Sequence, residues 1–474
     1  MKWWTLSLMA IATAAVNAAD VQYAVVAFPP NGAGVAVSVG GQNHALAADS
    51  QVPNLFKGSA PAGDYQYVLT NGQNATPELP KRKLADGATS TGNEFFNRTH
   101  TTVDVPALPQ AFNPVYPPLF TGFNKSNEVA TIILQVNSTA FDALVKDPKQ
   151  KGKAQVTSFA YVSSQEVFTF ANTPSIETSG QSTKDFAKQS YAIDFNDLTP
   201  KGGQKSLFYG RTAVKLRAEA TDPTQVREKL YLDCLAAAGA TTLSGSFVRV
   251  FINNQPYGLY TLMDDASTHL IDNTTFGNGA EQGRDSVAYG NYSRAGSTRP
   301  LVDLFLKSPY YKGQFETILQ TLVKRFFNPR VMQPRLEAWA TLLKEDIEWD
   351  YSIPGHSPGT QNSFTVANFI ANLNTTDGGM EGINQWITTR AKTLTQQLQF
   401  NDADDLPALG PYKQGARLDS NGNVVPNDGS SVTPGGSAPS GSNGAKGGTS
   451  GSSALTTSSL LVATMVVLAT VFSL

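Results

Sequence analysis

The chain has a single cysteine, few histidines and little charge, and each of these shortages excludes certain kinds of fold or site. Because Cys234 has no second cysteine to pair with, no intrachain disulfide can form and the fold has to rely on a packed core. The four histidines are scattered without metal-ligand spacing, so we expect no metal site. Charged residues make up 16% of the chain, against roughly 25% in an average globular protein. The formal net charge of −2 argues against an electrostatic nucleic-acid binder.

Residues 188–265 contain an unbroken succession of strand and helix patterns. Apolar and polar residues alternate over residues 190–195 and again over 214–217, which predicts two half-buried strands. Residues 247–252 and 257–263 then predict a hairpin that turns through two asparagines.

A helix is predicted between these strands and the hairpin. It would run from Pro223 to Ala238, with Asp222 as its N-cap and Gly239 after its last residue. Three residues at a spacing of four form its apolar face: Val226, Leu230 and Cys234.

The hairpin sequence FINNQPYGLYTLMDD and the segment KLRAEATDPTQVREKL resemble the CotH family. This family comprises spore-coat atypical kinases of bacteria and cell-surface relatives in fungi, and the two ends of this chain favour the fungal branch. Farther along, EDIEWDYSI and Ser357-Pro358-Gly359 resemble further elements of the family. The resemblance implies an α+β fold that contains a kinase-like domain.

The resemblance also implies a nucleotide site. Lys188 takes the place of the family's nucleotide-phosphate lysine on a predicted strand, and Lys215 lies on the next strand. Asp264 and Asp265 end the hairpin, where the family has an acidic residue that could pair with this lysine. Because a lysine can hold a phosphate as a point charge, these four residues are the candidates for a residual nucleotide site.

The catalytic part of the family's pattern is missing. Active members carry, after the hairpin, aspartate-containing elements that bind metal and orient the acceptor hydroxyl, as phosphoryl transfer requires. Here the sequence passes near residues 285–299 directly into the helices that end the domain, so we expect no catalytic residues, no cofactor and no enzymatic activity. Two alternatives remain open. Either the gene model has lost an exon, or Asp264, Asp265 and Asp285 assemble a metal site in another way, and ATP and Mg²⁺ would then bind.

Composition divides the chain into successive parts. Short alternating runs separated by Pro, Gly and Asn predict a β-sandwich over residues 20–101. A proline-rich connector, residues 102–127, leads to the kinase-like domain over residues 128–400. Residues 401–459 are rich in Gly, Ser and Pro and predict a disordered, flexible stalk.

Two shorter patterns add detail to these parts. In the last third of the kinase-like domain, apolar residues at helical spacing predict helices over residues 315–326, 336–347 and 383–398, and Pro329 separates the first two. In the sandwich, the cluster Lys81-Arg82-Lys83 is interpreted as a solvated loop.

The two ends of the sequence predict a surface protein. Residues 1–19, with Lys2 before an apolar run, have the pattern of a signal peptide. Residues 460–474 are apolar, and these fifteen residues are fewer than the roughly 20 that span a bilayer as a helix. A GPI-anchor signal with a removed tail fits better than a membrane span, and its attachment candidates are Asn443, Gly448 and Ser450.

Seven sequons predict a glycosylated surface. They begin at Asn74, Asn97, Asn124, Asn137, Asn273, Asn291 and Asn374.

Three functional hypotheses follow from the resemblance. The favoured one is a GPI-anchored adhesin or invasin of the cell surface or spore coat, which binds host-cell receptors and does not catalyse a reaction. The second is a secreted atypical protein kinase that uses ATP and Mg²⁺. The third is a structural component of the spore coat or cell wall.

Overall fold

The computed structural model describes residues 20–30, 32–72, 74–114, 122, 124–180, 182–240, 242–265, 306–410, 416–418 and 424–426. The contacts within the chain divide it into two units. Unit 1 comprises Met1–Thr101 with Ser164–Glu166, and unit 2 comprises Thr102–Ser163 with Val167–Leu474. The predicted signal peptide, the GPI-attachment candidates, the apolar tail and the sequons at Asn273 and Asn291 lie outside the described residues.

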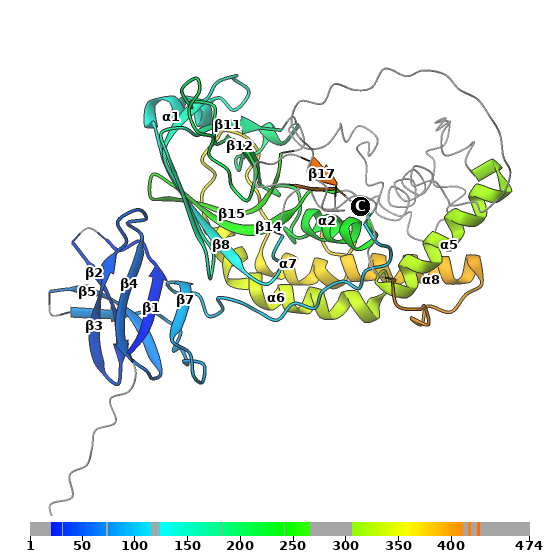
Figure 1. Ribbon diagram of the computed structural model, residues 1–474, viewed down its shortest axis with the longest axis horizontal. Coiled ribbons are helices and arrows are strands. Elements are labelled where there is room, and N and C mark those ends of the chain that lie inside the picture. Colours follow the sequence, from blue (N-terminus) through cyan, green and yellow to red (C-terminus); the bar gives the residue numbers. More distant parts are fainter. Residues whose placement is uncertain are drawn as a thin grey trace, which may run out of the picture. The chain divides into compact units, whose positions relative to one another are not determined.

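The architecture is α+β, as predicted. The described residues form two large mixed sheets, a two-stranded sheet and six α-helices. Unit 1 holds the first sheet, and unit 2 holds the second sheet and the helices. Figure 1 shows the strands of unit 1 in blue and the elements of unit 2 from cyan to orange.

Unit 1 is a seven-stranded sheet in the order β6-β5-β2-β3-β4-β1-β7. Only two residue pairs join β3 to β4, so the sheet can fold over at this point. Apolar side chains from both halves, among them Tyr23, Val25, Val37 and Tyr67, share one core. Its strands are β1 (Asp20–Val26), β2 (Gly34–Val39), β3 (Gln42–Ala48), β4 (Leu55–Pro61), β5 (Tyr65–Asn71), β6 (Asn74–Pro77) and β7 (Ser90–Phe95).

The basic cluster of unit 1 is not the solvated loop that its sequence predicts. Arg82 is only 7% exposed. Its guanidinium pairs with Glu78 at 2.7 Å and with Glu94 at 2.9 Å. Glu94 also accepts the hydroxyl groups of Tyr65 and Tyr67, both at 2.8 Å. Two buried carboxylates require a cation nearby, which explains why the middle residue of this cluster points inward.

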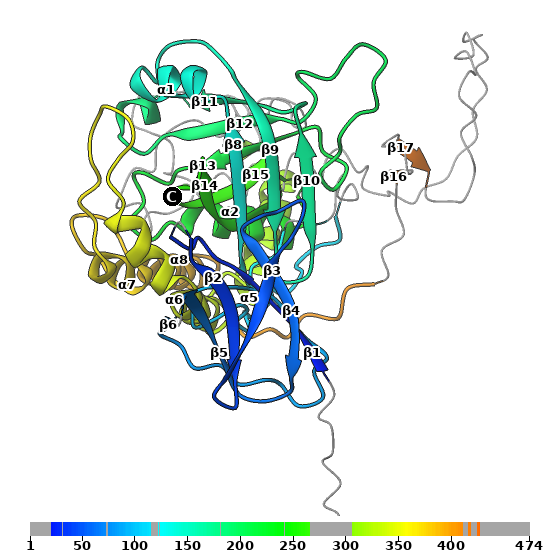
Figure 2. The same ribbon diagram turned by 90° about the vertical axis from the view of Figure 1, so that its left-hand side faces the viewer.

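Unit 2 contains an eight-stranded sheet that closes on itself. Its order is β10-β9-β11-β12-β13-β15-β14-β8, and β9 also pairs with β8. Figure 2 shows β8, β9 and β10 side by side. The inward side chains form one apolar core, which includes Ile132, Tyr161, Ile193 and Leu216. The strands are β8 (Val129–Val136), β9 (Ala154–Val162), β10 (Val167–Ala171), β11 (Ser175–Ser179), β12 (Ser190–Asp194), β13 (Ala213–Arg217), β14 (Gly245–Ile252) and β15 (Gln255–Asp264).

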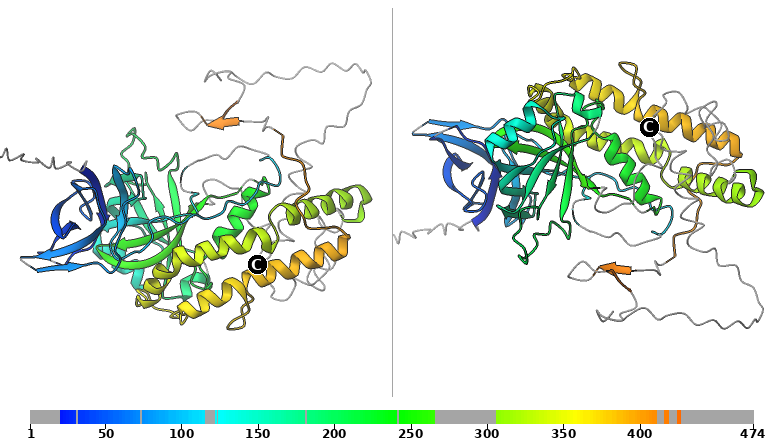
Figure 3. Two further views of the ribbon diagram at one scale, coloured as in Figure 1. Left: turned by 90° about the horizontal axis from the view of Figure 1, so that it is seen from below. Right: turned by 90° about the horizontal axis from the view of Figure 1, so that it is seen from above.

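The helices of unit 2 lie mostly on one side of this sheet, as Figures 1 and 3 show. The predicted helices of the last third are confirmed, since the apolar residues of 315–326 are buried and Pro329 starts the next helix. No helix in the described part of the chain is both long and apolar enough to cross a bilayer. The α-helices are α1 (Ser138–Lys146), α2 (Arg227–Ala237), α5 (Pro309–Arg325), α6 (Pro329–Ser352), α7 (Val366–Asn374) and α8 (Ile383–Leu398), and a 3-10 helix, η1, spans Ser182–Asp185.

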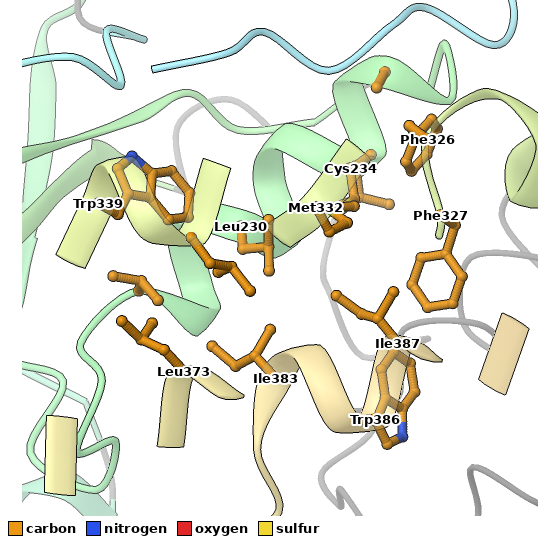
Figure 4. Packing of buried hydrophobic residues seen from close by; sticks show 14 of the residues in the cluster. Leu230, Cys234, Phe326, Phe327, Met332, Trp339, Leu373, Ile383, Trp386 and Ile387 are labelled. Carbon is orange, nitrogen blue, oxygen red and sulfur yellow. The ribbon is translucent and has the colours of Figure 1, made fainter. Parts of the chain in front are cut away.

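A second apolar core joins these helices to the outer face of the sheet. Figure 4 shows Leu230 and Cys234 of α2 beside Met332 of α6, with Ile383 and other residues of α8 opposite. The Cys234 side chain is 1% exposed, and burial raises the pKa of its thiol. The predicted apolar face of this helix is therefore confirmed.

The start of α2 differs from the sequence prediction. The helix begins at Arg227, and its N-cap is Val226 rather than Asp222. The preceding residues form turns in which Glu219 and Gln225 have φ angles of 51°. Asp222 stabilises these turns instead, because its carboxylate accepts hydrogen bonds from the Thr224 and Arg227 backbones. Gly239, with a φ of +77°, ends the helix as predicted.

The predicted hairpin is confirmed and is longer than its sequence pattern indicates. Strands β14 and β15 turn through Asn253 and Asn254, whose φ angles are 51° and 62°. Two positive φ angles suit the right-handed twist of a two-residue hairpin turn, and asparagine tolerates them.

The predicted stalk is structured where it begins. Asp404 and Asp405 pair with Arg325 and Lys324 at the end of α5, at 2.7 and 2.6 Å. Farther along, β16 (Ala416–Leu418) pairs with β17 (Val424–Pro426). The rest of the predicted stalk lies outside the described residues.

Candidate functional site

The candidate site is built around Lys188, which lies in a bend just before β12 and not on a strand as predicted. Its ammonium group donates to the Leu259 carbonyl at 2.6 Å and to Oδ1 of Asp350 at 2.7 Å. The oxygen of Gln225 lies 3.5 Å away. The ring of Tyr260 is 4.8 Å from the ammonium and adds a cation–π contact.

Asp350, the partner of Lys188, comes from helix α6 in the last third of the domain. Its side chain is 3% exposed and accepts two more hydrogen bonds, from the Leu259 backbone at 2.8 Å and the Gln225 amide at 2.7 Å. Helical spacing explains its position, because Leu343, Ile347 and Asp350 lie on the same buried face of α6. The carboxylate is therefore held by a lysine, an amide and a backbone N–H.

Gly258 makes this contact possible. It has a φ of +112°, and a side chain at this position would overlap with Oδ1 of Asp350. The hairpin therefore needs glycine where the helix approaches its backbone. This gives a physical reason for the glycine in the PYGLY part of the hairpin sequence.

The segment that contains Ser357, Pro358 and Gly359 forms one wall of the site. Ala187 donates its backbone N–H to the Thr360 carbonyl at 3.0 Å, and Ser357 donates to the Ala187 carbonyl at 3.1 Å. Gly359 has a φ of +134° and approaches the Asp185 backbone so closely that a side chain would collide with it. Two distant segments are thus fixed side by side next to Lys188.

A cleft opens beside the Lys188–Asp350 pair. The empty space in and in front of it is about 540 Å³, part of which is open solvent. Tyr257 and His356 both line it and stack on each other, with ring centroids 3.9 Å apart. Burial raises the pKa of Tyr257 to about 12, so its hydroxyl stays protonated at neutral pH and can donate a hydrogen bond. The cleft is further lined by Gln189, Tyr191, Tyr260, Gln361 and Asn362.

The four predicted site residues do not meet at this cleft. The acidic partner of Lys188 is Asp350, and Asp264 pairs with the buried Arg211 instead. Leu259 and Asp264 lie five residues apart on β15, which places Asp264 about 16 Å along the strand from the contact with Lys188. The pairing of Lys188 with the end of the hairpin is therefore wrong. The partly buried ammonium of Lys188 pairs with a buried carboxylate, and α6 supplies it.

Lys215 lies on the opposite face of β13 from the residues that pack with Tyr260. Burial lowers the pKa of its ammonium group, and nearby Arg217 lowers it further. Asp265 is among the acids that act in the opposite direction. Lys215 and Asp265 are therefore close enough to interact, but they do so away from Lys188.

A second long-range ion pair also joins helix α6 to the sheet. Arg249 of β14 donates two parallel hydrogen bonds to Asp346 of α6, at 2.6 and 2.8 Å. The two acids that sequence reasoning missed, Asp346 and Asp350, lie four residues apart on the apolar face of α6. Acidic residues on an apolar helix face need buried cations as partners. The two aspartates in EDIEWDYSI could therefore have predicted the ion pairs of Asp346 and Asp350.

Glu219, in the turn before α2, has an unusual environment. It is 8% exposed, and its Oε1 atom has no hydrogen-bond partner among the described residues. Burial, followed by repulsion from Glu228, raises the pKa of its carboxyl group to about 8. The group is therefore largely protonated at neutral pH.

In the part of the chain that the structure describes, no three His, Cys, Asp or Glu residues are close enough to hold a metal ion. Asp285, one of the alternative metal ligands, and the predicted shortening near residues 285–299 fall outside that part.

Comparison with known proteins connects this site to a family. The family model described as CotH kinase protein matches residues 176–283, which include Lys188 and the whole hairpin. The chain is 33% identical to invasin CotH2 of Rhizopus delemar over 272 residues, which are 56% of this chain and 41% of that protein. It is 32% identical to invasin CotH3 of the same fungus over 57% of this chain and 44% of that protein.

A longer but weaker similarity exists to spore coat protein homolog 1 of Rhizopus delemar, with 22% identity over 72% of this chain and 75% of that protein. The chain therefore spans less than half of the two invasins and most of the spore coat homolog. Together, the family model matched over residues 176–283 and these fungal relatives confirm the predicted resemblance to the CotH family.

Proposed function

We propose that this CotH-like protein is displayed on a fungal cell surface or spore coat, where it acts as an adhesin that binds receptors on host cells. It does so without transferring phosphate. Two relatives named invasin, each more than 30% identical to the chain, support the cell-surface role.

The observation that carries the non-catalytic part is the place of Asp264, the acid predicted near the phosphates. Phosphoryl transfer needs metal ligands close to the phosphate-binding lysine. Asp264 pairs with Arg211 instead, about 16 Å along β15 from the contact of Lys188 with Leu259. The pairing of Lys188 with Asp350 does not itself exclude a nucleotide, because active kinases hold their phosphate-binding lysine in a similar pair.

Surface display rests on the sequence ends together with the sequons. The chain would enter the secretory pathway through residues 1–19, lose residues 460–474 and receive a lipid at Asn443, Gly448 or Ser450. All five sequon asparagines in the described residues are exposed, namely Asn74, Asn97, Asn124, Asn137 and Asn374. Exposed asparagines are compatible with N-linked glycans on the folded protein.

Adhesion is tested by displaying the full chain on a yeast that does not adhere to host cells. We expect these yeast cells to bind more strongly to a host-cell monolayer. Adding the same protein in soluble form should abolish this gain by competition. Asp350→Asn, which removes the charge of the site but keeps its shape, should bind equally well. No gain over yeast that carries the empty anchor would contradict the adhesin role.

A structural role in the coat or wall is the second candidate, and the similarity to the spore coat homolog over 72% of the chain favours it. The mode of release distinguishes the two. A GPI-specific phospholipase should free an anchored adhesin from wall-loosened cells, whereas a wall component should be released only by glucanase.

A further inference from the structure

The segment after strand β6 exposes an apolar side chain to an unusual degree. Leu79 is 88% exposed, the largest value for a large apolar residue in the described part of the chain. Strand β6 is the terminal strand of the unit 1 sheet, and its residues are exposed. A terminal strand next to an exposed leucine is a place where another chain could attach.

A sequon asparagine lies directly beside this leucine. The backbone N–H of Leu79 donates to Oδ1 of Asn97 at 2.8 Å, although the two residues are 18 positions apart. Asn97 begins the sequon Asn97-Arg98-Thr99. A candidate glycosylation site is thus one hydrogen bond away from the most exposed leucine.

The position of Asn97 is fixed by the buried charges of unit 1. Its backbone N–H donates to Oε2 of Glu78 at 3.0 Å, and the same carboxylate pairs with Arg82. The φ of Asn97 is 61°, a left-handed conformation that asparagine tolerates. The amide therefore stands on a rigid base and not on a loose loop.

The orientation of this amide leaves its nitrogen available. Oδ1 is occupied by the Leu79 N–H, and within the described residues Nδ2 donates to no acceptor. Glycosylation of Nδ2 keeps Oδ1 and one N–H, so the hydrogen bond to Leu79 persists after modification. Nδ2 and Oδ1 are both bonded to Cγ of Asn97. A sugar on Nδ2 therefore begins close to the hydrogen bond between Oδ1 and the Leu79 N–H.

We propose that Asn97 carries an N-linked glycan whose first sugar covers Leu79 and shields the end of the β6 edge. Glycan transfer forms a bond between Nδ2 and C1 of a sugar carried on a polyprenyl diphosphate. The bond from C1 to the diphosphate oxygen breaks, and the amide proton leaves with the lipid diphosphate. The apolar face of the sugar ring packs on the leucine, and its hydroxyl groups face water. The inference rests on the secretion that the proposed function requires.

Hydroxyl-radical footprinting of the secreted full-length protein tests this shield. Oxidation of Leu79 should be low in the glycosylated protein and several-fold higher in Thr99→Ala, which removes the sequon but keeps the Asn97 side chain. Thr99→Ser, which preserves the sequon, is the matched control and should behave like the parent. Trimming the folded parent with an endoglycosidase that leaves one sugar should keep Leu79 protected, whether or not the variants are secreted.

Two results would overturn the proposal. One is an unmodified Asn97 in a glycopeptide mass spectrum, and the other is equal oxidation of Leu79 with and without the glycan. If Asn97 alone is unmodified while Asn124 and Asn137 carry glycans, only this inference fails. If the parent chain is not secreted at all, the proposed surface display fails together with this inference.

Discussion

Both units bury an ion-pair network, but the two networks connect different distances along the chain. In unit 1, Arg82 pairs with Glu78 and Glu94, which are four and 12 residues away. In unit 2, Lys188 pairs with Asp350, which is 162 residues away. The first network holds a loop to its own strands, and the second fastens helix α6 to the hairpin.

The two networks also differ in what surrounds them. Arg82 and Glu78 have side chains 5% and 0% exposed, and tyrosine hydroxyls complete the group. The Lys188 side chain is 16% exposed and lines a cleft. Similar ion-pair chemistry therefore has two roles. The local network stabilises one sheet, whereas the long-range network joins helix α6 to the hairpin beside a cleft.

The largest expected effect comes from breaking the long-range network. Asp350→Ala leaves the Lys188 ammonium without its carboxylate and the Leu259 N–H without an acceptor. We expect a loss of about 3–5 kcal/mol in the free energy of unfolding, the usual cost of breaking a buried pair. Urea unfolding followed by tryptophan fluorescence measures it, because Trp339, Trp349 and Trp386 all lie in α6 and α8. Asp350→Asn, which keeps an acceptor, should lose less, and equal losses below 1 kcal/mol would refute the coupling.

Breaking the local network should cost somewhat less and should affect unit 1. Arg82→Ala leaves two carboxylates buried, but burial already raises the pKa of Glu94, so this group can take up a proton. We expect a loss of about 3 kcal/mol in the stability of unit 1. Calorimetry should show a lower melting temperature for one transition while the tryptophan signal stays unchanged. Lys83→Ala, at an exposed position of the same cluster, is the control and should have no effect.

A pH-dependent effect is expected at Glu219. The folded-state pKa of Glu219 is raised to about 8, above its ordinary value, so its contribution to stability is present at acidic pH and is lost as the pH rises towards 8. Glu219→Gln should therefore flatten the decline in melting temperature between pH 5 and 9. An unchanged decline in this variant would show that Glu219 ionises without cost in the folded protein.

The smallest effect concerns the turn before α2. Asp222→Ala removes the acceptor for the Thr224 and Arg227 backbone N–H groups and should cost about 1 kcal/mol. Asp222→Asn, which retains an acceptor, should recover part of this loss in the same urea titration. A variant as stable as the parent would mean that these turns form without the carboxylate.

The sequence predicted the parts of unit 2 that depend on local pattern. The hairpin follows from alternation and two asparagines, and the buried face of α2 follows from residues four apart. The predicted start of α2 was wrong. Asp222 and Pro223 have the local sequence pattern of a helix start, but the chain first makes turns with positive φ at Glu219 and Gln225. These turns carry Gln225 to Asp350, a tertiary contact that no local signal contains.

The candidate site was predicted only in part, because it too depends on a contact between segments that are distant in the sequence. Lys188 was identified, but its carboxylate was sought at the end of the neighbouring hairpin and lies instead on α6. The polarity of α6 contained the missing signal, since two acids occur on its apolar face. In unit 1, the inward position of Arg82 depends on Glu94, which only the folded sheet brings close.

The most direct test of the account is phosphate transfer by the full-length secreted protein. Purified protein is incubated with γ-labelled ATP and either Mg²⁺ or Mn²⁺, and phosphate incorporation into the protein and into general acceptor proteins is measured. Because Arg211 holds Asp264 away from Lys188, we expect no incorporation above that of Lys188→Ala and Lys188→Arg, the second of which retains a cation for Asp350. Metal-dependent incorporation by the parent that both variants lack would contradict the non-catalytic account and establish the protein as a kinase.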